Sequence, residues 1–133
     1  MTVVNFSFTK LLAEKKKVAK GKIDIKNNIS IKDVSEAKMA IDAKRTALKF
    51  NFLYEATYEP EVGKINLGGE VIYVLDKKVA DDVMKMWKKD KKVKADFMTN
   101  LMNHILAKSN IQAVIMSRDI NLPAPIPLPK IKG

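Results

Sequence analysis

Residue types that carry covalent or metal chemistry are scarce in this sequence. The 133 residues include no cysteine and one histidine, His104. Thiol nucleophiles, cysteine-ligated zinc or iron–sulfur centres and multi-histidine metal sites are therefore excluded. His104 has no second histidine or carboxylate pair beside it, so we expect a structural role. Asp81 and Asp82 are adjacent, and neighbouring helical side chains diverge by about 100°, which disfavours a shared cation. We expect no metal, no cofactor and no catalysed reaction.

Lysine dominates the charged residues. Lys and Arg total 25 against 15 Asp and Glu, giving a formal net charge of +10. A basic domain of this kind is a candidate for binding nucleic acid or another anionic surface. The charge is concentrated in two clusters, which are Lys15, Lys16, Lys17, Lys20 and Lys22 in the first and Lys88, Lys89, Lys91, Lys92 and Lys94 in the second.

These clusters lead to the first functional hypothesis, in which the protein binds structured RNA and associates with the ribosome. Each lysine that neutralises a phosphate releases a condensed counterion, and this favours binding. The only arginines are Arg45 and Arg118, so contacts with the phosphate backbone are expected rather than base readout. The alternative is a solvated lysine-rich surface without a specific partner.

Hydrophobic periodicity predicts one α+β domain with strands first and helices afterwards. Residues 1–20 form an N-terminal arm and a Lys-rich segment, residues 21–76 an antiparallel sheet, residues 77–120 two helices and residues 121–133 an extended proline-rich tail. Val4, Phe6 and Phe8 indicate a short strand or a packed arm, and residues 10–20 are either a short helix or a charged loop. No window is apolar enough to span a membrane, and no signal peptide is visible, so we expect a cytoplasmic protein.

Three alternating segments predict the strands of the sheet. Their apolar positions are Ile23, Ile25, Ile29 and Ile31, then Leu48, Phe50, Phe52, Tyr54, Ala56 and Tyr58, and finally Ile65, Leu67, Val71, Tyr73 and Leu75. A kink is expected near Asn27. Pro60 and Gly63 predict a turn that joins the second and third segments as a hairpin. Gly68 and Gly69 indicate a bulge or a close backbone approach within the last strand.

The period becomes helical after Asp76. The first predicted helix places Val79, Val83, Met86 and Trp87 on one face. The second, from about residue 95 to 120, has an apolar face of Phe97, Met98, Leu101, Met102, Ile105, Ala113 and Met116 opposite a smaller and more polar stripe of Asn100, Asn103, Ala107, Asn110 and Ser117. Prolines from Pro123 onward end this helix. The tail is either a ligand for an aromatic groove or a segment that lies on its own or a neighbouring sheet.

The order of strands, two helices and a proline-punctuated tail resembles the SecB preprotein-export chaperone family. The tail, Leu122-Pro123-Ala124-Pro125-Ile126-Pro127-Leu128-Pro129, is similar to that of small uncharacterised archaeal relatives. The resemblance implies a four-stranded antiparallel sheet backed by helices, oligomerisation, and apolar grooves for extended polypeptide. This chain differs from the chaperone in being basic, and fold can persist where function does not.

The resemblance supplies the second hypothesis, a chaperone or adaptor that binds extended polypeptide. The binding surface is then expected beside Phe50, Phe52, Tyr54 and Trp87. Core packing is the alternative role for Trp87, because it shares a helical face with valines. Homo-oligomer formation stays open, since periodicity does not show which faces are covered. An enzyme is the least favoured class.

Overall fold

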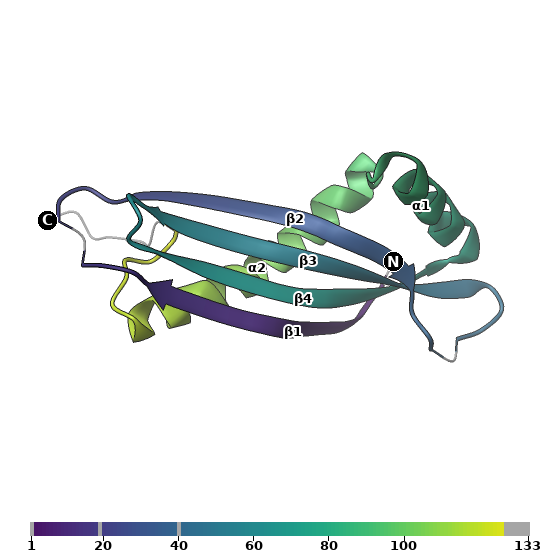
Figure 1. Cartoon of the computed structure of the whole chain (residues 1–133). Helices are drawn as coiled ribbons and strands as arrows, with labels where there is room; N and C mark the ends of the chain where they lie inside the picture. The colour runs from purple at the N-terminus through teal and green to yellow at the C-terminus, as the bar shows by residue number, and fades with distance from the viewer. Residues whose placement is uncertain (1, 19, 40, 127–133) are drawn as a thin grey trace, which may run out of the picture.

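A four-stranded antiparallel sheet and two helices make up the fold. The computed structural model describes residues 2–18, 20–39 and 41–126. The elements are β1 (Thr2–Lys15), β2 (Asp24–Glu36), β3 (Arg45–Glu59), β4 (Gly63–Asp76), α1 (Lys77–Asp90) and α2 (Ala95–Asp119). The sheet order is β1-β4-β3-β2, and α2 crosses the sheet diagonally while α1 lies at one end (Figure 1). The predicted α+β class with strands before helices is confirmed.

The alternating pattern determines which sheet face the helices cover. On β3, every second residue from Leu48 to Tyr58 is buried, and β4 follows the same rule from Ile65 to Leu75. The predicted hairpin is confirmed, with Tyr58 paired to Gly63 and Arg45 to Asp76. Because side chains alternate across a strand, the buried residues of both strands face the helices and form the core.

The N-terminal segment extends the sheet further than the sequence predicts. β1 runs without a helix to Lys15 and pairs with β4 along its length, from Thr2 opposite Val74 to Lys15 opposite Gly63. Residues 10–15 are therefore strand, not a helix or loop, because pairing with β4 satisfies their backbone groups. The register shift in β2 lies at Lys32 and not at the expected kink near Asn27.

Helix α1 is rotated relative to the predicted face. Its buried residues are Ala80, Val83 and Trp87, whereas Val79 and Met86 are 44% and 39% exposed. These two side chains lie beside a small cavity of about 110 Å³ between the helices, which Phe97 also lines. Two residues of the predicted apolar face, Val79 and Met86, therefore border the cavity and not the sheet.

Helix α2 buries a line of residues spaced four apart, namely Phe97, Leu101, Ile105, Ser109, Ala113 and Ser117. A spacing of four exceeds the helical repeat of about 3.6, so the buried line winds around the helix as it crosses the twisted sheet. Ser117, predicted on the polar stripe, is only 2% exposed, while Ile111 is 64% exposed. Small residues occupy the buried line in the second half of α2, and its isoleucines point outward.

Candidate functional site

The two lysine clusters lie at opposite ends of the molecule. The first begins at the last residue of β1 and continues toward β2, while the second lies at the end of α1 and in its connection to α2 (Figure 1). All ten lysines are exposed. Lys17, Lys20 and Lys22 share a hollow of about 350 Å³ with Pro60 and Val62. The clusters therefore do not form one continuous basic surface.

All four aromatic residues expected beside a polypeptide are core residues. Phe50 and Tyr54 are 0% exposed, Phe52 is 3% and Trp87 is 6% exposed. The Phe50 ring lies 5.2 Å from the Phe97 ring, between centroids, inside the sheet–helix core. Lys91 covers Trp87 from outside, with Nζ 5.5 Å from the ring centroid. Tyr54 alone among the four also lines an open hollow.

That hollow lies where β2 passes α2. Helix α2 packs mainly on β4, so the side chains that β2 directs toward the helices are left partly uncovered. The result is an apolar hollow of about 270 Å³, here named the β2–α2 groove, lined by Asn27, Asn28, Ile29, Tyr54, Met102 and Leu106. β2 is also an edge strand, with no neighbour on its outer side among the described residues.

The segment after α2 continues this groove. Its described part runs from Leu122 to Ile126, and from here on "the tail" means these five residues. The tail lies opposite the start of β2, where Ile23, Asp24, Ile25 and Asn27 are here named the tail seat. A hollow of about 440 Å³ lies between this seat and Ala124, Pro125 and Ile126 of the tail. Asn27 lines both the β2–α2 groove and the tail seat. The two surfaces therefore meet at this residue.

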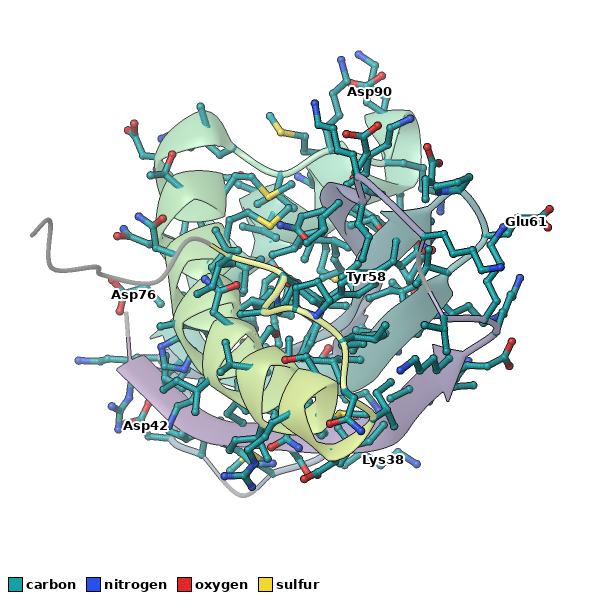
Figure 2. All side chains as sticks on the ribbon, turned by 90° about the vertical axis from the view of Figure 1, so that its left-hand side faces the viewer. Lys38, Asp42, Tyr58, Glu61, Asp76 and Asp90 are labelled. Atoms are coloured by element: carbon teal, nitrogen blue, oxygen red, sulfur yellow. The ribbon has the colours of Figure 1, made fainter. Side chains whose placement is uncertain are left out.

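Two side chains hold the tail by its backbone carbonyls. Tyr58 Oη donates to the Pro123 carbonyl at 2.6 Å, and Asn27 Nδ2 donates to the Pro125 carbonyl at 2.8 Å. Figure 2 views the molecule from this end and shows Tyr58 beside the yellow segment that follows α2. Tyr54 Oη lies 3.4 Å from Asn27 Oδ1, which directs the amide nitrogen of Asn27 toward the tail.

The tyrosine hydroxyls at this end act as neutral donors. Burial, and next the nearby Tyr54, raises the pKa of Tyr58 to about 12. Burial also raises the pKa of Tyr54. Removing these phenols from water disfavours their anionic forms, so both keep their protons at physiological pH. The hydrogen bond from Tyr58 to the tail therefore persists throughout that range.

The described residues do not form a candidate metal centre. Among residues 2–18, 20–39 and 41–126, no three histidine or carboxylate side chains are placed to hold a metal ion. His104 lies edge-on to Phe6, with ring centroids 5.7 Å apart, in an aromatic environment. An apolar hollow, a free strand edge and amide and hydroxyl donors are features that proteins in general use to bind extended polypeptide.

Neither the known protein families nor the curated proteins contain a match to this sequence. Among solved structures, the chain is similar to the Mycobacterium tuberculosis Rv1957 SecB-like chaperone in complex with a ChAD peptide from the Rv1956 HigA1 antitoxin. The TM-score is 0.56 at 9% identity, and the match covers 99% of this chain and 91% of the chaperone chain. The chain has a SecB-like fold.

The SecB-like fold corrects the first functional hypothesis. The similar structure is a chaperone bound to a peptide, so the expectation of RNA and ribosome association is wrong. Lysine content indicated the wrong partner class because it reports net charge, not the surface that binds. The SecB resemblance is confirmed for the fold, whereas the proline motif beyond Ile126 lies outside the described residues.

Of the described helices, none has the length and apolarity needed to cross a membrane.

Most residues of the β2–α2 groove were not singled out as binding residues. Met102 and Leu106 lie four residues apart on α2, beside the buried line, and Ile29 belongs to the predicted apolar face of β2. An i, i+4 apolar pair flanking a core stripe is the signal that could have indicated a second surface. Where that surface meets β2 depends on the packing of the helix on the sheet.

Proposed function

We propose that this protein is a non-enzymatic chaperone or adaptor that binds extended apolar polypeptide segments in the β2–α2 groove. The observation that carries the proposal is the continuity of this groove with the tail seat, where an irregular stretch of polypeptide is already held. The SecB-like fold, shared with a chaperone that binds a peptide, supports the same function.

The groove provides the interactions that such a ligand needs. Ile29, Met102 and Leu106 offer apolar surface, and the flexible thioether of Met102 adapts to side chains of different shape. A hollow of about 270 Å³ is at the small end of ligand pockets, so it suits individual side chains of a polypeptide. Binding then depends on burial of apolar surface and is insensitive to ionic screening.

The test is a titration with an uncharged peptide of about 15 residues rich in Leu, Val and Pro, labelled with a neutral fluorophore and long enough to lie along a strand edge. Fluorescence anisotropy is measured at about 0.1 M and about 1 M NaCl, a range over which lysine–phosphate contacts are strongly weakened. We expect saturable binding whose dissociation constant changes less than about twofold, because apolar burial persists in salt. Absence of binding, or affinity lost about tenfold or more in salt, would contradict the proposal.

A further inference from the structure

We infer that the tail is a resident competitor for polypeptide clients, which must displace it to occupy the full length of the groove. This inference rests on the proposed function of the β2–α2 groove. Three observations support the inference. They are the contacts of the tail, the chemistry of its prolines and the surfaces that it separates.

The tail is held by contacts that can be broken without disturbing the sheet. Its carbonyls at Pro123 and Pro125 accept one hydrogen bond each, from Tyr58 and Asn27, and Pro125 is buried. In the described part of the chain, the tail makes no backbone hydrogen bond to β2. Prolines have no N–H group, so the tail loses little when it leaves an edge strand that it does not pair with.

The tail stays attached next to its seat when it is released. The Leu122 amide donates to the Ser117 carbonyl at 2.9 Å, and the Leu122 side chain is 7% exposed within the core cluster that contains Val62 and Ile65. This anchor holds Pro123 to Ile126 beside the tail seat at high effective concentration. The competitor therefore acts within its own chain.

The tail separates apolar surfaces that a client could use together. On one side of it is the β2–α2 groove, which meets the seat at Asn27. On the other side, Ile126 lines a hollow of about 310 Å³ with Asn110, Ile111, Val114 and Ile115, on the outward side of α2. Ile111 is 64% and Ile115 is 41% exposed. Departure of the tail would join these surfaces, and the seat would accept another apolar segment with free carbonyls, including one with alternating prolines.

The first test unseats the tail with the double substitution Pro125→Asp and Ile126→Asp. The two new carboxylates would lie beside Asp24, and one of them would replace the buried Pro125, so like-charge repulsion and desolvation both favour release of the tail. The control, Asn100→Asp and Asn103→Asp, makes the same charge change on exposed positions of α2. We expect the uncharged peptide to bind the unseated variant about tenfold more tightly than the wild type, with no change in the control. The apparent dissociation constant of a partly blocked site is its intrinsic value divided by the fraction of molecules in which the site is open, and the substitution raises that fraction.

The outcomes distinguish the two proposals. If the wild type and the unseated variant bind the peptide equally, the tail is not a competitor, while the proposed function stands. If neither protein binds it, the proposed function fails and this inference fails with it.

A second test supplies the tail in trans. A synthetic peptide with the sequence of residues 121–126 is titrated into the unseated variant bound to the labelled client, and a peptide with aspartates at the positions of Pro125 and Ile126 is the control. We expect the first peptide to release the client and the second to be without effect. Failure of the first peptide to compete would show that clients do not use the tail seat, and would overturn the inference.

Discussion

Substituting Met102→Asp is expected to raise the dissociation constant of the uncharged client peptide by about 30-fold or more, equivalent to about 2 kcal/mol. Met102 lines the β2–α2 groove and belongs to neither core cluster of the described structure. A bound client would bury the new carboxylate against apolar side chains, with no partner to offset its desolvation. Anisotropy titration of the variant measures the effect, and circular dichroism verifies the fold.

The neighbouring residue provides the matched control for this substitution. Asn103 is exposed and does not line the groove, so Asn103→Asp adds the same charge one position away. We expect this variant to bind the peptide within about twofold of the wild type, because an exposed charge is screened by water and salt. Equal binding by both variants would mean that clients bind elsewhere.

The second large effect is expected at Gly69. A Cβ atom at Gly69 would overlap the Ser7 carbonyl oxygen and lie 2.8 Å from Phe52 Cζ. Phe52 is itself packed against both Phe6 and Phe8, with ring centroids at 5.4 and 6.2 Å, so it has little room to move. We expect Gly69→Ala to reduce the free energy of unfolding by about 3 kcal/mol, at the upper end of the usual cost of overpacking a core.

The adjacent glycine separates this steric effect from a general cost of replacing glycine. At Gly68, a Cβ atom would meet Lys10 Cβ at 3.4 Å, which is ordinary van der Waals contact. Gly68→Ala should therefore change the free energy of unfolding by less than about 1 kcal/mol, as found for substitutions that create no clash. Urea denaturation of both variants measures the difference. A similar loss in both, or no loss for Gly69→Ala, would refute the close approach of β1, β3 and β4 at this point.

The sequence predicted the parts of the fold that local physics determines. The β3–β4 hairpin followed from period-two alternation on both sides of Pro60 and Gly63, and the close approach expected at Gly69 is present. The Lys-rich end of β1 was not predicted, because its strand conformation comes from pairing with β4. The burial of Ser109 and Ser117 on α2 was also missed, since their small side chains face the sheet through tertiary packing.

The sequence predicted less of the candidate site than of the fold. All four predicted aromatic residues fill the core, and Tyr54 alone among them also lines the groove, because it lies on β3 opposite Ile29 of β2. The groove exists because α2 passes over β4 and leaves part of β2 uncovered, and periodicity contains no information on that crossing. The lysine runs were visible at once, yet exposure and net charge alone do not distinguish a binding surface from a solvated one.

The central claim is that polypeptide clients lie in the β2–α2 groove, and disulfide trapping tests it most directly. The chain has no cysteine, so Met102→Cys and Asn103→Cys each introduce a single thiol. Each variant is mixed with the uncharged peptide, whose one central cysteine is activated as a mixed disulfide with 2-thiopyridine. The protein thiolate attacks the cysteine sulfur and releases thiopyridone, and the rate of this release measures disulfide formation. The proposed function predicts rapid trapping at position 102 and slow trapping at position 103, because only the first faces the groove. Equal rates, or faster trapping at position 103, would contradict it.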